Sequence, residues 1–176
     1  VAMLSGPLVQ AQQSDEGKRL HAFFAEEWER SLRENPESAS FEGDRRYNDR
    51  WTDNSPNAIA GREAADREAL ARLKGFDRSK LAPADQLNYD TFLWLQQKTV
   101  QRKTFREYLQ PIGHQGGVQN ADGLIEGLAF NEARDYRDWL ARMRALPDAI
   151  DQTIALMREG VKAGNVPPRV LMQRVP

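Results

Sequence analysis

The sequence predicts an all-α protein, an array of about five to six helices packed around a long central helix over residues 83–108, within a larger helical protein. Two observations predict this fold class. Apolar residues recur at steps of three and four along most of the chain. Between these stretches, Ser, Asn, Pro and Gly stand where helices start and stop. The 176 residues, of which 40% are hydrophobic, suffice for one domain.

The bulk composition excludes several classes of protein. The chain carries 25 basic and 26 acidic side chains and a net charge of -1. Nucleic-acid binders usually show a net basic face, so no nucleic-acid partner is expected. The absence of cysteine excludes a disulfide framework and a thiolate metal site. No stretch of about 18 apolar residues exists, so no membrane span is predicted.

The two ends of the chain differ from the middle. Residues 1–13 are uncharged and contain Val9-Gln10-Ala11, which resembles the end of a secretory signal peptide without its positive n-region. We expect residues 1–13 to be a signal-peptide remnant or a disordered tail. The protein is then exported, and is periplasmic or membrane-anchored outside the cytoplasm. Residues 14–176 are expected to be the N-terminal helical region of a larger domain, truncated at Pro176.

The first helix is predicted over residues 15–34. Ser14 is placed to cap it, and Asn35-Pro36 ends it. Its apolar stripe consists of Leu20, Phe23, Phe24, Trp28 and Leu32. His21 lies one residue from this stripe and has no second ligand near it in the sequence. We interpret His21 as a boundary histidine rather than a metal ligand.

Residues 36–55 show no steady period and are dense in Asp, Arg and aromatic residues. Charge-assisted hydrogen bonds between Arg and Asp lock irregular segments of this kind, and that is the first interpretation. The alternative is a polar patch that lines a cleft. The acidic residues do not have the spacing of an EF-hand calcium loop, which is rejected.

The second helix is predicted to begin at Ser55-Pro56 and to run to Lys74, with Gly75 just past its end. Its apolar stripe is thin, so one side is expected to be exposed. The central helix then begins at Pro83, with Asp85 at the positive end of the dipole. The first half of the central helix is apolar on nearly every side and is expected to be buried by several neighbours. Its second half is polar and is expected to lie near a surface.

The central helix leads into an uncharged loop, residues 110–119, in which Pro111 stops the helix and three glycines relax the backbone. Loops are usually charged, so this one is a candidate binding surface. The alternative is a tight turn whose glycines allow close helix packing. The candidate residues for a cleft or substrate-binding surface are His114, Gln115, Gly116 and Gly117.

Three further helices are predicted after the loop. A short one covers residues 121–128, and Asn131 caps the next. The apolar face of that next helix is formed by Ala133, Tyr136, Trp139, Leu140, Met143 and Leu146. Its solvent face is formed by Arg134, Arg137, Asp138 and Arg142. Pro147 opens the last helix, which ends at Gly164. The packing seam of the last helix is formed by Ile150, Ile154, Met157 and Val161.

No catalytic constellation is found. The chain has two histidines, His21 and His114, and no His-Glu-x-x-His pair, phosphate loop, Gly-x-Ser-x-Gly or cysteine nucleophile. The many carboxylate pairs are explained as charges on helix surfaces. No residue of this chain is therefore assigned as catalytic or as a metal ligand.

Four short stretches occur in the order seen in the bacterial domain of unknown function 885 family. They are Gly43-Asp44-Arg45-Arg46-Tyr47-Asn48-Asp49-Arg50 with Asp53, Leu87-Asn88-Tyr89-Asp90, Tyr108-Leu109-Gln110-Pro111-Ile112 with Gln115-Gly116-Gly117-Val118, and Val166-Pro167-Pro168-Arg169-Val170. The chain resembles this family from Gly17 to Pro176. The residues interpreted as a structural motif are Asp44, Arg46, Tyr47, Asp49, Asn88, Tyr89 and Asp90.

The resemblance implies a large, mostly helical, exported protein similar to zinc-dependent metallopeptidases. The metal motif of the family, similar to His-Glu-x-x-Pro-Gly-His, lies in its C-terminal half and has no match here. Zinc is therefore implied for the full-length family, and no cofactor is expected in this chain. The expected partners are the missing C-terminal half of the same chain and a peptide substrate.

Two functions are therefore weighed. In the first, the chain is the N-terminal helical portion of an exported, zinc-dependent, peptidase-like hydrolase, and forms a wall of its substrate cleft without being catalytic. In the second, it is a non-catalytic helical interaction or scaffold module. A truncated wall exposes apolar faces and binds a hydrophobic dye, whereas a complete module is monodisperse and melts cooperatively.

Overall fold

The computed structural model describes residues 14–113 and 116–175, and within these ranges every regular element is helical. The α-helices are α1 (Asp15–Glu34), α2 (Pro36–Phe41), α3 (Pro56–Lys74), α4 (Pro83–Arg102), α5 (Ala133–Arg144), α6 (Leu146–Lys162) and α7 (Arg169–Met172). The 3-10 segments are η1 (Arg45–Tyr47), η2 (Arg78–Lys80), η3 (Lys103–Phe105), η4 (Glu107–Leu109) and η5 (Val118–Gly127). The predicted all-α class is confirmed.

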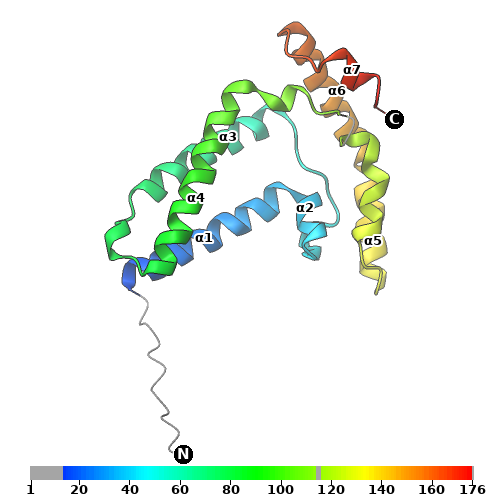
Figure 1. Cartoon of the computed structure of the whole chain (residues 1–176). Helices are drawn as coiled ribbons and strands as arrows, with labels where there is room; N and C mark the ends of the chain where they lie inside the picture. Colours follow the sequence, from blue (N-terminus) through cyan, green and yellow to red (C-terminus); the bar gives the residue numbers. More distant parts are fainter. Residues whose placement is uncertain (1–13, 114–115, 176) are drawn as a thin grey trace, which may run out of the picture.

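The helices form an arch with two arms (Figure 1). One arm is a bundle of α1, α3 and α4, and the other consists of α5, α6 and α7. The segment from α2 to Asn54 lies between the arms, and η5 contacts both α2 and α6. The predicted signal remnant or tail, residues 1–13, lies outside the described residues. Among the described helices, none has the length and apolar character required to cross a bilayer.

The first arm has an apolar core, and the predicted helix starts are found there. Ser14 caps α1 by accepting a hydrogen bond from the Gly17 backbone N–H at 3.0 Å. Ser55 caps α3 in the same way, and Pro56 follows in its first turn. The buried core residues of this arm are Leu20, Phe23, Ala69, Leu73, Leu81 and Tyr89. These side chains join α1, α3 and α4 through one continuous apolar cluster.

The central helix is shorter than predicted. It ends at Arg102, and η3 and η4 follow with the left-handed residue Arg106 between them, at φ 49°. The turn swings Leu109 into a second small core, where it packs with Ile59 and Leu156. The apolar periodicity of this stretch therefore reflects burial after a turn, not a continuing helix.

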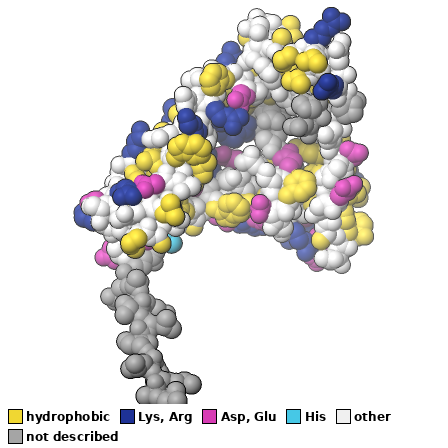
Figure 2. Space-filling model, in the orientation of Figure 1, with side chains coloured by type: hydrophobic (Ala, Val, Ile, Leu, Met, Phe, Trp, Pro, Cys, Tyr) yellow, Lys and Arg dark blue, Asp and Glu magenta, His cyan; other side chains and the backbone are white. Residues whose placement is uncertain are grey.

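The expectation that the first half of α4 is surrounded by neighbours is also wrong. Tyr89 is buried, but Leu87, Trp94 and Leu95 are exposed, Leu87 to 67%. Within the described residues α4 packs mainly on α3 and more weakly on α1. Figure 2 shows hydrophobic side chains on the surface of both arms, around a central hollow. Only one side of the apolar helix is thus covered.

In the second arm, the buried faces are not those that the apolar pattern predicted. On α5, the apolar residues Tyr136, Leu140 and Met143 are exposed, whereas Asp135 and Arg142 are buried. On α6, the expected seam is displaced by one residue, because the buried positions are Ala149, Thr153, Leu156 and Gly160. Small residues on that face allow α6 to approach its neighbours closely, which the larger isoleucines would prevent.

Several boundaries also differ from those predicted. The irregular segment after Pro36 begins with a short helix, α2, and the expected helix over 121–128 is the 3-10 segment η5. Glu132, not Asn131, caps α5, through a capping box with Asp135. Residues 165–168 have no regular secondary structure, and a single turn, α7, follows them.

Candidate functional site

Residues of two motif stretches, and the Trp51-Thr52 pair that directly follows a third, lie around Pro111, although they are far apart in the sequence. A cavity of about 550 Å³ lies on one side of Pro111, between the Trp51-Thr52 segment and the loop residues Gly117 and Val118. A smaller, apolar cavity of about 210 Å³ lies on the other side, between η4, α6 and the Val166-Pro167 segment. We call the larger one the loop cavity, and it is the candidate functional site.

The loop that lines this cavity has a fixed backbone on both sides of its tip. The Gly113 N–H donates to the Gly116 carbonyl at 2.8 Å, and the Gln119 side-chain amide donates to the Gly113 carbonyl at 2.9 Å. Gly117 has φ 142°, and a Cβ there would lie 3.0 Å from the Pro111 carbonyl. Position 117 therefore requires glycine. Gly116 is exposed with open space around it, and the candidates His114 and Gln115 lie outside the described residues.

The opposite wall of the loop cavity is held by Arg142, whose side chain is completely buried. Its guanidinium donates to the carbonyls of Arg50 and Tyr47, each at 2.8 Å, and more weakly to the Pro36 carbonyl. It also donates to the Ser40 hydroxyl at 3.0 Å. The guanidinium thus fastens α2 and the irregular segment to α5. Burial disfavours the charged guanidinium and lowers the pKa of Arg142, and the nearby carboxylates of Glu37 and Asp49, which do not bond to it, oppose this shift only in part.

The sequence placed Arg142 on the solvent face of its helix, so this contact is a correction. Nothing local distinguishes Arg142 from Arg134 or Arg137, which are exposed on the same helix. The only indirect signal is the tryptophan of the irregular segment, which needs a partner for its indole N–H. In the structure Trp51 donates this N–H to the Arg142 carbonyl at 2.7 Å. The Arg142 guanidinium also lies 5.6 Å from the centre of the Trp51 ring.

The predicted motif residues of the irregular segment form the expected Arg–Asp pairs. Asp44 accepts from the Arg46 backbone N–H and side chain, both at 3.0 Å, and thereby caps η1. The Arg46 side chain and backbone hydrogen bonds lower the pKa of Asp44. Asp49 pairs with Arg50 at 2.7 Å. The Tyr47 ring lies under the guanidinium groups of Arg46 and Arg50, at 5.4 and 5.9 Å.

The fourth motif stretch, residues 87–90, does not join the others. Tyr89 is buried in the core of the first arm, and Asp90 pairs with Arg78 at 2.6 Å. Asn88 lines a separate groove between α1 and α4. The residues that were predicted to form one structural motif therefore lie in two different parts of the fold, the irregular segment and the first arm.

The Val166-Pro167 segment reaches Pro111 because α6 and η4 are in close contact. A Cβ at Gly160 would lie 2.7 Å from the Leu109 carbonyl and 2.8 Å from the Asn165 carbonyl. Asn165 donates its side-chain amide to the Phe105 carbonyl at 3.0 Å and accepts from the Gln110 side chain. Gly160 and Asn165 thereby hold η4 and the Val166-Pro167 segment against the end of α6, on either side of the smaller cavity.

The chemistry of the loop cavity is that of a binding surface. Its described lining combines one carboxylate, of Glu37, with two hydroxyls, amides and the apolar side chains of Phe41, Val118 and Leu124. The Glu37 carboxylate already accepts from the Thr52 backbone N–H at 3.0 Å and from its hydroxyl at 2.5 Å. Because the one charged group among the described lining residues is held in this way, the cavity suits an uncharged ligand.

The residues of the described ranges do not fit a zinc site. No group of three or more His, Cys, Asp or Glu residues is placed to hold a metal ion there. His21 is paired with Asp85 at 2.6 Å, at the edge of the first arm, which agrees with its interpretation as a boundary histidine. Two ligands alone do not make a protein zinc site, which takes three or four.

Comparison with known proteins gives one match. The family model described as bacterial protein of unknown function (DUF885) matches residues 36–176. No curated protein and no solved structure matches the chain significantly. The match covers the loop, the Arg142 contact and all four motif stretches. The chain therefore belongs to the DUF885 family of bacterial proteins of unknown function.

Proposed function

We propose that this chain is the non-catalytic helical wall of a substrate cleft in an exported, zinc-dependent, peptidase-like hydrolase of the DUF885 family. In this proposal the loop cavity faces the peptide substrate. Zinc and the catalytic residues come from a further helical region of the same polypeptide, which also covers the exposed apolar face of α5.

The single observation that supports this proposal is that residues of two family motif stretches, and the Trp51-Thr52 pair just after a third, lie around Pro111. The contacts there hold backbone rather than charge: Arg142 fastens the Trp51 side, and Gly117 keeps the loop close to Pro111. The cavity has rigid backbone walls, and the carboxylate of Glu37 in its lining already accepts hydrogen bonds. Such a cavity is suited to positioning an uncharged chain such as a peptide.

A binding experiment with a matched pair of glycine variants tests this role. The probe is acetyl-Ala-Ala-Phe-Ala-amide, and binding to the purified chain is followed by calorimetry. We expect the probe to bind, and Gly117→Ala to weaken binding about tenfold because its Cβ would collide with the Pro111 carbonyl. Gly116→Ala, in open space, is expected to bind as the unaltered chain does. Equal binding by both variants would exclude the loop cavity as the substrate-facing surface.

The non-catalytic part of the proposal has its own measurement. We expect the purified chain to contain no stoichiometric zinc by elemental analysis and to leave the same peptide intact after prolonged incubation with added zinc. One equivalent of tightly bound zinc, or cleavage of the peptide, would overturn this part without affecting the binding result.

A second candidate function is a helical interaction or scaffold module, in which the exposed apolar side chains receive a partner protein. Tyr136, Leu140 and Met143 form one exposed face on α5. If the chain is a wall covered by a further region, the isolated chain binds a hydrophobic dye and self-associates. If it is a complete module, sedimentation shows a single species, and the chain melts in one cooperative transition.

A further inference from the structure

Most polar side chains that line the loop cavity are already hydrogen-bonded within the protein. Trp51 donates its indole N–H to the Arg142 carbonyl at 2.7 Å, so its one hydrogen-bonding group is occupied. The Thr153 hydroxyl, which belongs to a buried residue, donates to the Ala149 carbonyl at 2.9 Å. A group that enters the cavity therefore meets a tryptophan ring and a threonine whose donors are already in use.

The rest of the polar lining disfavours a charged group in the cavity. The Glu37 carboxylate accepts two hydrogen bonds from Thr52, and a cation would have to compete with these bonds. The described lining contains no lysine or arginine, so an anion would find no counter-charge there. The other two polar side chains of the described lining are the uncharged amides of Asn54 and Asn120.

The apolar part of the lining combines buried residues with one exposed ring. Leu124 of η5 and Ala149 of α6 are buried. Phe41, the last residue of α2, also lines the cavity and is 64% exposed. An apolar group in the cavity would therefore contact side chains that are already buried and would itself cover the Phe41 ring. Both contacts remove apolar surface from water.

The Phe41 ring is positioned by its neighbours, although it is exposed. The preceding residue, Ser40, accepts from the buried Arg142 guanidinium at 3.0 Å, which anchors the end of α2. A Cβ at Gly127 of η5 would lie 2.9 Å from both Cδ1 and Cε1 of the Phe41 ring. The ring therefore rests against bare backbone, and a side chain at position 127 would displace it.

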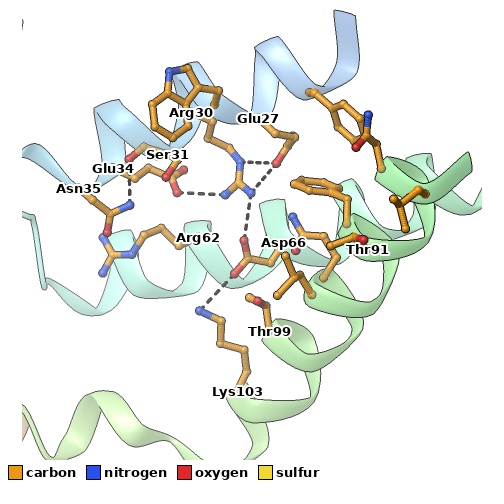
Figure 3. A pocket seen from close by; sticks show the side chains of 17 residues that line it. Glu27, Arg30, Ser31, Glu34, Asn35, Arg62, Asp66, Thr91, Thr99 and Lys103 are labelled. Carbon is orange, nitrogen blue, oxygen red and sulfur yellow. Dashed lines mark hydrogen bonds and ion pairs between the residues drawn. The ribbon is translucent and has the colours of Figure 1, made fainter. Parts of the chain in front are cut away.

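A larger cavity, of about 1010 Å³, lies in the first arm between α1 and α4 and has a different lining (Figure 3). Its charged lining residues, three acidic and three basic, are Glu27, Glu34, Asp66, Arg30, Arg62 and Lys103. Arg30 donates to Glu27 at 2.6 Å and to Asp66 at 3.0 Å. An apolar side chain bound there would remove water from several charges, which is unfavourable. The loop cavity, with one carboxylate in its described lining, is the better place for an apolar group.

We propose that the loop cavity takes one large apolar side chain of the peptide substrate, and that it prefers an aromatic one because the rings of Phe41 and Trp51 line it. This assignment rests on the proposed function, in which the cavity faces the substrate, and it adds the class of residue that is recognised. The cavity volume of about 550 Å³ lies within the range of about 300–1,000 Å³ that is typical of ligand sites. It therefore accommodates an aromatic side chain together with the adjoining peptide backbone.

The test compares peptides acetyl-Ala-Ala-Xaa-Ala-amide that carry Phe, Leu, Ala or Lys at the third position. Binding of each to the purified chain is followed by calorimetry. We expect the Phe peptide to bind about thirtyfold more tightly than the Ala peptide, because its ring leaves water. We expect it to bind about threefold more tightly than the Leu peptide, because only a ring gains the aromatic contact with Phe41 and Trp51. The Lys peptide is expected to bind no better than the Ala peptide.

Matched variants assign the preference to the Phe41 ring. Phe41→Ala is expected to reduce the thirtyfold preference for the Phe peptide to about threefold and to leave the Ala peptide unaffected. Phe105→Ala truncates a ring of similar exposure outside the cavity and is expected to keep the full preference. Trp28→Ala, in the cavity of the first arm, is expected to keep it as well. Gly127→Ala is expected to reduce the preference in part, because its methyl group displaces the Phe41 ring.

The outcomes separate this assignment from the proposed function. Equal binding of the Phe and Ala peptides, or equal weakening of both by Phe41→Ala, would overturn the assignment. Tightest binding of the Lys peptide would also overturn it and would make Glu37 the recognition group. If Gly117→Ala still weakens every peptide in these cases, the loop cavity remains the substrate-facing surface. If the Phe preference depends on Phe41 but Gly117→Ala binds as Gly116→Ala does, the aromatic preference stands and the proposed role of the loop fails.

Discussion

Each arm of the molecule withdraws an arginine from solvent, Arg30 partly and Arg142 completely, and the two arms do so in opposite ways. Arg30, in the bundle of α1, α3 and α4, has three carboxylates as partners. Arg142, in α5, has carbonyls and a hydroxyl and no carboxylate bonded to it. The first arm also has an apolar core, whereas α5 keeps its apolar face in solvent. The first arm is thus held by its apolar core, to which the ion pairs of Arg30 are added. The other arm depends on the hydrogen bonds of the buried Arg142.

This difference shows how a charged side chain can serve as a core residue. A cation buried without a counter-ion is tolerated when several oxygen atoms accept its hydrogen bonds. The carbonyls that bond to Arg142 come from the start of α2, the end of η1 and the irregular segment that follows it, which has few regular backbone partners of its own. The arginine and the segment therefore satisfy each other, and neither is expected to be ordered alone.

The variant Arg142→Met tests that dependence most directly. It removes the guanidinium donor from the carbonyls of Tyr47 and Arg50 and from the Ser40 hydroxyl, so we expect the free energy of unfolding to fall by about 4 kcal/mol. Urea denaturation measures the loss. Arg144→Met, on an exposed position of the same helix, is expected to change stability by less than about 0.5 kcal/mol. Similar losses in both variants would show that the buried guanidinium does not hold the segment.

The corresponding variant in the first arm is Phe23→Ala. Phe23 is buried against Phe76 and Phe92, so its truncation leaves a cavity and is expected to reduce stability by about 3–4 kcal/mol. Phe105→Ala, on a mostly exposed ring, is the control and is expected to cost under about 0.5 kcal/mol. If Phe23→Ala proved as mild as its control, the contrast between an apolar and a charged arm would fail.

A third variant examines the close contact beneath the smaller cavity. Gly160→Ala places a methyl group against two backbone carbonyls, which cannot move aside as a side chain can, and is expected to cost about 2 kcal/mol. Gly61→Ala in α3, with open space around it, is expected to stabilise by about 0.5 kcal/mol. Thermal melting of the pair measures both. A neutral Gly160→Ala would mean that α6 and η4 are not in close contact in solution.

The smallest expected effect is a dependence on pH at the start of α5. Burial is the largest single influence on Asp135 and raises its pKa, but the N–H groups of Glu132 and Asn131 and the Arg45 guanidinium together lower it below the ordinary value. A carboxyl group with a lowered folded-state pKa stabilises the protein above the unfolded pKa, about 3.9. This contribution is lost as the pH falls through the folded pKa.

We therefore expect stability to decline with acid below about pH 4, and Asp135→Asn to show a flatter decline. Urea midpoints measured between about pH 2.5 and 6 give the two curves. Arg45→Met removes one partner of Asp135 and is expected to flatten the decline in part. If Asp135→Asn loses stability in acid as steeply as the unaltered chain, carboxylates other than Asp135 cause the decline.

Much of the fold could be read from local signals. The starts of α1 and α3 at Ser14 and Ser55 follow from capping chemistry, which involves only adjacent residues. The position of the loop after Pro111 likewise follows from residues within the loop itself. For the candidate site, the sequence identified the loop and the Arg–Asp segment. It could not show that Gly117 and Trp51 line one cavity, because that requires contacts between distant parts of the chain.

The sequence by itself determined that this protein is helical, where most of its helices begin, and which family it belongs to. Only the tertiary structure decided which helix faces are buried, where α4 ends, and that Arg142 lies in the interior while Leu87 lies in solvent. The physical reason is that periodicity records which side chains could be buried. Burial itself depends on which distant segment packs there and whether its oxygen atoms satisfy the buried donors.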